Sequence, residues 1–143
     1  MFSVEPYLLF NGDCEEAFHF YKTVFGGEFS DMMRYKDMPE QSEKFPDELK
    51  DKILHVSLPL GKGVLLMGSD AGPGPNSVNK GNNIVLTLDV DDEEEAKRLF
   101  EKLSKEGKII MPLEKTFWAE LYAMFTDKFG INWSINYGFE KKQ

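Results

Sequence analysis

The stretch that decides the fold is YLLFNGDCEEAFHFYKTVFGG, residues 7–27. A second stretch, IVLTLDVDDEEEAKRLFEKL at residues 84–103, has the same order of apolar and polar segments. Each stretch begins with a short apolar run, continues through a turn that contains Asp, and ends in a segment with the apolar spacing of an amphipathic helix. When the two are superposed, four positions coincide: Ala17, Phe20, Tyr21 and Val24 fall on Ala96, Leu99, Phe100 and Leu103. A strand–helix unit present twice predicts a pseudo-symmetric fold with a cleft between equivalent sheets.

Turn and cap residues predict where the two helices begin and end. Asp13, with Glu16 three residues later, is a capping-box-like pair at the start of the first helix, and Gly26-Gly27 ends that helix. The second helix is expected from about Glu93 to Glu106, with Asp91 or Asp92 as its cap and Gly107 at its end.

Three further strands are expected after each helix. In the first half they lie at 28–35, 53–60 and 64–69, and in the second half at 108–113, 117–126 and 131–137. Residues 36–51 are a charged excursion with a helical turn around Asp47–Lys50. Three interpretations of residues 36–50 remain open: a lid over the pocket, a dimer contact or a mobile loop. The predicted order is therefore β-α-β-β-β, twice.

The module boundary is expected in a segment rich in Gly and Pro. We predict one domain made of a module at 1–70, a linker at 71–82 and a module at 83–143.

Composition limits the class of protein. The chain has 143 residues of which 41% are hydrophobic, which is enough for a folded core. Its net charge of −8 argues against binding to nucleic acid or to anionic membranes. The single cysteine, Cys14, allows no internal disulfide, and no signal peptide or membrane-spanning stretch is expected. We therefore expect a cytoplasmic protein.

Three stretches resemble a known family: PYLLFNGDCEEAFHFYKTVFGGE (6–28), KILHVSLPLGKGVLLMGSD (52–70) and MPLEKTFWAELYAMFTDKFGINWSINY (111–137). They look like the PhnB-like branch of the vicinal oxygen chelate superfamily, which includes glyoxalases, bleomycin-resistance proteins and extradiol dioxygenases. The resemblance implies an α+β fold of paired βαβββ modules, each with its helix on the convex side of a curved sheet. It also implies a pocket formed by the concave sides, and a homodimer.

Metal-dependent members of that superfamily bind a divalent ion with His and Glu from the first and last strands of each module. Their terminal motif resembles Asp-Pro-Asp-Gly followed, four residues later, by a ligand Glu. Here the motif is Asp127-Lys128-Phe129-Gly130, and the ligand position holds Ser134, a poor metal ligand. The other three ligand positions fall in 6–9, 64–69 and 83–88, which contain neither His nor Glu. The comparison of motifs therefore predicts no metal site, and no cofactor is expected.

His55 is the main candidate for chemistry in the first module. Leu54, Val56 and Leu58 alternate with it, so packing of those residues under the helix would turn His55, with Ser57, toward the pocket. Two interpretations remain open: a hydrogen-bonded strand histidine, or an acid/base or ligand-orienting group. The other histidine, His19, is expected on the solvated side of the first helix.

The final strand offers a second set of candidates. Asn132, Ser134 and Asn136 share one face, which either lines the pocket or faces solvent. Trp118, Glu120 and Tyr122 are expected on one face of the preceding strand, with Glu120 as the only acidic candidate for site chemistry. Their alternatives are core packing, dimer packing or an exposed carboxylate.

Three residues complete the candidates. Tyr7 and Met67 are expected to line the cavity. Cys14 lies in the first helical turn, where a thiol is either activated by the helix dipole or inert.

The sequence favours a metal-independent protein that binds an unidentified small molecule, with an apolar pocket edged by His55, Asn132, Ser134 and Asn136. The alternative is an enzyme of the superfamily that uses His55 with Glu120, or an atypical metal site. A third interpretation is an interaction module that works mainly as a dimer.

Overall fold

The computed structural model describes residues 1–38, 44–72 and 77–138. The chain forms two compact units, Met1–Asn79 and Lys80–Gln143, which we call unit 1 and unit 2 and describe separately. The undescribed residues include parts of the predicted excursion at 36–51 and of the predicted linker at 71–82, so those predictions lie partly outside the described residues.

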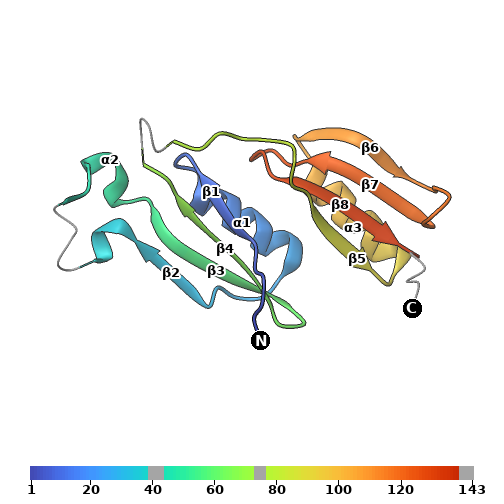
Figure 1. Cartoon of the computed structure of the whole chain (residues 1–143), viewed down its shortest axis with the longest axis horizontal. Coiled ribbons are helices and arrows are strands. Elements are labelled where there is room, and N and C mark those ends of the chain that lie inside the picture. The colour runs from blue at the N-terminus through green and yellow to red at the C-terminus, as the bar shows by residue number, and fades with distance from the viewer. Residues whose placement is uncertain (39–43, 73–76, 139–143) are drawn as a thin grey trace. The chain divides into compact units, whose positions relative to one another are not determined.

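Unit 1 contains a four-stranded sheet and one long helix (Figure 1). Its elements are β1 (Tyr7–Phe10), α1 (Cys14–Phe25), β2 (Asp31–Arg34), the 3-10 turn η1 (Tyr35–Asp37), α2 (Asp47–Lys50), β3 (Ile53–Gly61) and β4 (Val64–Asp70). The strand order is β1-β4-β3-β2, with β1 parallel to β4 and the other pairs antiparallel.

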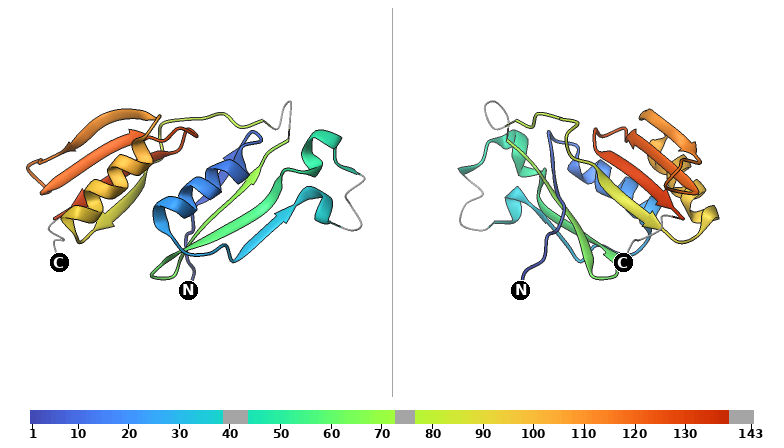
Figure 2. Two further views of the ribbon diagram at one scale, coloured as in Figure 1. Left: turned by 180° about the vertical axis from the view of Figure 1, so that it is seen from behind. Right: turned by 45° about the vertical axis from the view of Figure 1, so that its right-hand side comes forward.

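Unit 2 repeats this arrangement. Its elements are β5 (Leu86–Val90), α3 (Glu93–Ser104), β6 (Lys108–Glu114), β7 (Leu121–Thr126) and β8 (Asn132–Tyr137). The order β5-β8-β7-β6, with β5 parallel to β8, matches unit 1 strand for strand. The two views of Figure 2 show each long helix on one face of its own sheet. The predicted α+β fold of two βαβββ modules is confirmed.

The core of unit 1 lies between α1 and its sheet. The buried helix residues recur at the spacing of one helical face: Cys14, Ala17, Phe18, Tyr21 and Val24. The prediction that Phe20 belongs to this face was wrong, since Phe18 is fully buried and Phe20 is only partly buried. A Cβ on Gly68 would lie 2.6 Å from the ring of Phe18, so only glycine lets this ring pack against β4.

Unit 2 builds its core from smaller helix residues and larger strand residues. Ala96, Leu99 and Leu103 of α3 are buried, as are Trp133 and Ile135 of β8. Three of the four predicted helix positions are therefore buried, and the fourth, Phe100, is only partly buried.

The two helices begin in different ways. Asp92 caps α3, because its Oδ2 accepts a hydrogen bond from the Glu95 N–H at 2.9 Å, as predicted. Asp13 makes no side-chain cap bond, so the predicted capping box at α1 was wrong. Instead the buried carboxylate of Asp70 accepts from the N–H groups of Gly12 (2.9 Å) and Cys14 (3.0 Å), and its other oxygen accepts from Ile53 N (2.9 Å).

Asp127 has a comparable role in unit 2. Its Oδ1 accepts from the N–H groups of Phe129 and Ile131, and its Oδ2 accepts from the Trp133 indole N–H at 2.9 Å. Gly130 has a φ of 90°, which suits glycine at this turn. These bonds form a tight turn between β7 and β8.

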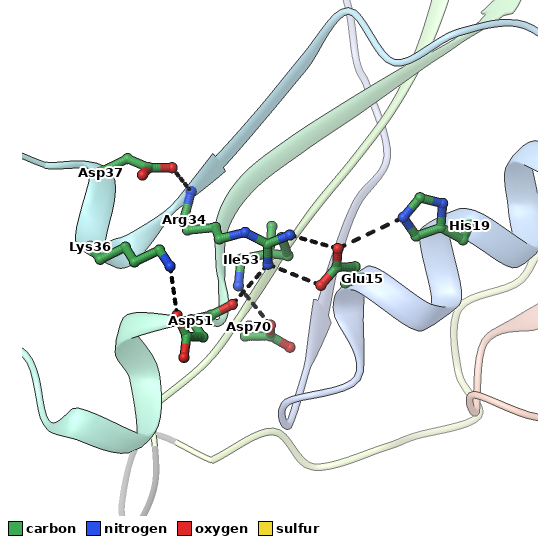
Figure 3. Close-up of polar contacts among 8 residues, drawn as sticks. All are labelled: Glu15, His19, Arg34, Lys36, Asp37, Asp51, Ile53 and Asp70. Carbon is green, nitrogen blue, oxygen red and sulfur yellow. Dashed lines mark hydrogen bonds and ion pairs between the residues drawn. The ribbon is translucent and has the colours of Figure 1, made fainter.

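Hydrogen bonds to Arg34 of β2 join the described part of the predicted excursion to the rest of unit 1, and ion pairs lie beside them (Figure 3). The guanidinium of Arg34 donates to both carboxylate oxygens of Glu15 on α1, at 2.9 and 2.6 Å, and to the Asp51 carbonyl at 2.8 Å. Lys36 pairs with the Asp51 carboxylate at 2.8 Å. The predicted helical turn at Asp47–Lys50 is present.

One strand is irregular and one strand prediction needs correction. The register of β2 against β3 shifts at Arg34, which pairs with the fully buried Ile53. Residues 117–120 do not belong to a strand, because the Thr116 hydroxyl accepts from Trp118 N and Ala119 N and forms a turn before β7.

Candidate functional site

Each sheet has one face that lies opposite its helix, and we call it the open face of that unit. Side chains at directly paired positions of neighbouring strands point to the same face. In unit 1, Tyr7 pairs with Met67, Met67 with Ser57, and Ser57 with Asp31. These residues therefore form one row across the open face, while Val56 and Leu58 are buried on the helix side. Three predicted pocket residues are thus brought together.

His55 lies on the same face, two residues from Ser57, and forms a short chain of polar contacts. The Tyr7 hydroxyl lies 3.1 Å from His55 Nδ1, within hydrogen-bond distance. On the other side, His55 Nε2 lies 3.8 Å from Asp31 Oδ2. The imidazole side chain is 30% exposed, so solvent or a ligand can reach it. An acid/base group held between a hydroxyl and a carboxylate has the elements needed to accept and release a proton.

Ser57 already has a partner within unit 1. Its hydroxyl lies 2.7 Å from the hydroxyl of Ser30, and the residue is 5% exposed. Ser57 therefore supports the row of side chains and is poorly placed to contact a ligand. Met67 and the half-exposed Tyr7 and Leu9 add apolar surface beside His55.

The open face of unit 2 also consists of paired rows. Asn132 pairs with Thr126, Ser134 with Met124 and Thr87, and Asn136 with Tyr122 and Asp89. The predicted polar row of the last strand therefore lies on the face opposite α3.

Two of the three predicted polar residues of that row are engaged within the unit. The Thr126 hydroxyl donates to Asn132 Oδ1 at 2.8 Å, and Asn132 Nδ2 donates to the carbonyls of Gly81 and Ile84. The Ser134 hydroxyl lies 2.7 Å from that of Thr87, and Ser134 is 2% exposed. These contacts fix the side chains and leave little capacity for a ligand.

Asn136 differs from its neighbours. Its Oδ1 is buried and is the one such side-chain atom without a hydrogen-bond partner across residues 1–38, 44–72 and 77–138. A buried acceptor without a donor is uncommon in native proteins and calls for an explanation.

The aromatic candidates lie beside Asn136. Tyr122 is its neighbour on β7, and the rings of Tyr122 and Trp118 meet edge to face with centroids 5.2 Å apart. Glu120 lies just before β7, is exposed, and packs against Gly138. His55 belongs to unit 1 and Glu120 to unit 2, so the predicted pairing of these two residues remains a prediction.

Cys14 and His19 show no sign of site chemistry. Burial, followed by the negative charges of Asp70, Asp13 and Glu15, raises the pKa of the Cys14 thiol far above its ordinary range, so activation by the helix dipole was the wrong alternative. His19 is exposed on α1, next to Glu15 and Phe29, as expected.

The donor set for a metal ion is poor. Within the described parts of the chain, no three His, Cys, Asp or Glu side chains lie close enough to share an ion. Ser134, at the position that corresponds to a metal ligand in the superfamily, is hydrogen-bonded to Thr87.

None of the described helices is long and apolar enough to cross a membrane.

The duplicated βαβββ fold and its helix-free faces define a class, and the sequence comparison agrees. The chain belongs to the glyoxalase/bleomycin resistance protein/dioxygenase superfamily, whose family model matches residues 3–135. Among curated proteins it is similar to protein YjdN of Escherichia coli K12, with 34% identity over 143 residues and 93% of each chain covered.

Solved structures identify the branch. Protein PA1353 from Pseudomonas aeruginosa is 38% identical, with a TM-score of 0.83 and coverage of 98% of this chain and 100% of the other. A PhnB protein from Bacillus cereus, which carries the provisional name 3-demethylubiquinone-9 3-methyltransferase, is 25% identical, with a TM-score of 0.75 and coverage of 95% and 99%. These similarities support the PhnB-like branch.

Asp31 and Asp89 are open-face residues that the sequence reasoning missed. Asp31 lies in a strand with weak signals, and its partner His55 is 24 residues away along the chain. Asp89 alternates with Leu88 and Val90, and this alternation was the signal that places it on the same side as Thr87.

Proposed function

We propose that this chain is a metal-independent small-molecule-binding protein whose units bind through their open faces, and that it works as a homodimer in the cytoplasm. Two open-face observations carry the proposal: His55 is 30% exposed between Tyr7 and Asp31, and Asn136 Oδ1 has no hydrogen-bond partner among the described residues. Paired hydroxyls and amides hold the face rigid, which favours binding because little side-chain entropy is lost. The aromatic rings beside them provide apolar contact.

The identity of the residues at the superfamily's ligand positions supports independence from metal. Ser134 is a weak donor for a divalent ion, and its hydroxyl is engaged by Thr87. Cys14, the single thiol, is buried, which suits a reducing compartment but does not require one.

Native mass spectrometry of the protein, purified without dialysis, tests the proposal. We expect an organic mass bound to the dimer in wild type, a smaller bound fraction in His55→Ala, and an unchanged fraction in the matched control His19→Ala. Elemental analysis of the same sample should show no stoichiometric divalent metal. A stoichiometric metal, or equal loss of the ligand in both histidine variants, would contradict the proposal.

A second candidate function is acid–base catalysis at the open face of unit 1. The observation that favours it is the chain Tyr7–His55–Asp31, in which the Asp31 carboxylate lies 3.8 Å from Nε2 and the tyrosine hydroxyl lies 3.1 Å from Nδ1. Incubation of the co-purified compound with the protein, followed by mass spectrometry in D₂O, distinguishes the two functions. Incorporation of deuterium that His55→Ala abolishes would establish catalysis, and an unchanged compound would leave binding as the function.

A further inference from the structure

We propose that the open face of unit 2 around Asn136 is a subsite for an organic cation, an ammonium or guanidinium group attached to an apolar body. This inference rests on the proposed function and specifies the chemistry of the ligand. It uses three independent features of the same row: an acceptor without a donor, carboxylates beside it, and aromatic rings.

The first feature is the Asn136 carbonyl oxygen. The other amide and hydroxyl groups of the row, Asn132 with Thr126 and Ser134 with Thr87, satisfy one another. Asn136 Oδ1 is buried and has no partner in the described ranges. Leaving a buried acceptor without a hydrogen bond is unfavourable, so the site is suited to a ligand that supplies an N–H or O–H donor.

The second feature is the charge of the row. Asp89 on β5 is in register with Asn136, and Glu114 on β6 is in register with Tyr122. Both carboxylates are exposed, and they flank the centre of the row from opposite strands. Glu120 adds a third carboxylate next to Gly138, which follows β8 closely. Negative charge on both sides favours a positively charged donor over a neutral hydroxyl and disfavours an anion.

The third feature is aromatic. The ring centroids of Tyr122 and Trp118 lie 5.2 Å apart, and those of Trp118 and Phe117 lie 4.8 Å apart. Phe117 is 96% exposed. Aromatic faces attract organic cations and provide apolar contact for the group that carries the charge. A carbonyl acceptor, carboxylates and aromatic rings together are the groups that bind a substituted ammonium ion.

Two probes with the same phenyl ring and opposite charges test this inference. Phenethylammonium and phenylacetate are titrated separately into the ¹⁵N-labelled full-length protein near neutral pH, and the amide signals of β7 and β8 and the side-chain NH₂ of Asn136 are followed. We expect phenethylammonium to shift these signals and to bind at least about tenfold more tightly than phenylacetate, since it alone donates to Asn136.

Variants separate the contributions. Asn136→Leu removes the acceptor at similar volume, and we expect binding of phenethylammonium to weaken by about tenfold or more, with a melting temperature equal to or above that of wild type. Asp89→Asn should weaken binding about threefold, whereas the matched control Asp91→Asn, outside the row, should leave it unchanged. If the leucine variant does not fold, Asn136→Asp provides the test, and its binding should be equal or tighter.

Equal or tighter binding of phenylacetate would overturn the inference and leave the binding function in place, since a different ligand class would then occupy the same face. A leucine variant that folds and binds phenethylammonium as well as wild type would also overturn the inference, because the Asn136 oxygen would then make no contact with the cation. If neither probe binds, the cation subsite is rejected. An organic mass on the native protein in that case would still support the proposed function, and its absence would remove both.

Discussion

Units 1 and 2 share strand order, pairing directions and helix position, yet their open faces carry different chemistry. Unit 1 presents a histidine between a tyrosine hydroxyl and a carboxylate, His55 between Tyr7 and Asp31. Unit 2 presents hydroxyls and amides that bond to one another, and one acceptor without a donor. Duplication therefore determines the backbone, whereas residues pointing away from the core are free to specialise.

The cores of the two units differ as well. In unit 1 the helix supplies the bulk, because Phe18 packs against Gly68 of β4. In unit 2 the position equivalent to Gly68 in the strand register is Ile135, and the helix residue equivalent to Phe18 is the half-exposed Lys97. At this position the space between helix and sheet is filled by a helix residue in unit 1 and by a strand residue in unit 2. Equivalent backbones thus do not require equivalent core residues.

The largest effect is expected at the buried carboxylates. Asp70→Ala leaves three N–H donors from two segments, residues 12–14 and the start of β3, without an acceptor, and we expect it to lower the free energy of unfolding by about 3–5 kcal/mol. Asp127→Ala should cost less, because its donors all lie within the turn that follows Asp127 and the adjoining start of β8, so it joins no distant segments. Urea denaturation, with Asp91→Ala as the control, measures both. An Asp70 variant as stable as the control would contradict this role.

Gly68→Ala tests the difference between the cores. The new methyl group would meet the Phe18 ring at 2.6 Å and the Leu8 carbonyl at 2.9 Å, so we expect a loss of about 1–3 kcal/mol. Gly81→Ala is the matched control, because its Cβ meets only Asn83 at 3.8 Å. Thermal unfolding of both variants provides the measurement, and equal melting temperatures would show that Phe18 can move aside.

Alkaline pH should weaken the protein through Cys14 in unit 1, which has no counterpart in unit 2. Burial raises the pKa of this thiol above that of an unfolded cysteine, about 8.5. The folded state therefore keeps a proton that the unfolded state loses. This contribution to stability is fully present below pH 8.5 or so and is lost as the pH rises toward the folded pKa. Cys14→Ala should lose less stability than wild type between about pH 8 and 10. Identical slopes in urea melts would refute this.

The smallest effect is expected at the surface ion pairs. The hydrogen bond from Arg34 lowers the pKa of Glu15, and a similar bond from Arg98 lowers that of Glu95. Each contribution is present above the ordinary glutamate pKa, about 4.3, and is lost as the pH falls through the lowered value. Because these groups are partly exposed, we expect Arg34→Ala to cost about 0.5–1 kcal/mol. Arg98→Ala should cost about 0.3 kcal/mol, since it breaks a pair within one helix. Denaturation at pH 7 and pH 3 checks both, and a larger effect at Arg98 would reverse the ranking.

Periodicity predicted the repeated βαβββ order and nearly all strand positions, because each depends on neighbours along the chain. It could not choose between Phe18 and Phe20, since α1 is aromatic at both positions and either choice fits a helical face. Local patterns could not predict that Asp70 caps α1, because Asp70 is 56 residues from Cys14 along the chain.

The candidate site was predicted only in part, for a similar reason. Alternation along single strands placed His55 and Asn136 on the faces where they lie. Their partners come from other strands, so the engagement of Asn132 and Ser134, and the chain from Tyr7 to Asp31, required the sheet register. Whether these residues bind a ligand stays a prediction.

The most direct test of the central claim is to map the co-purified or cognate small molecule onto the ¹⁵N-labelled protein by amide chemical-shift changes. We predict that the shifts concentrate on open-face residues, Tyr7 and His55 in unit 1 and Tyr122 and Asn136 in unit 2, and that the exposed sides of α1 and α3 do not change. Shifts confined to the helices, with the open faces silent, would contradict the account.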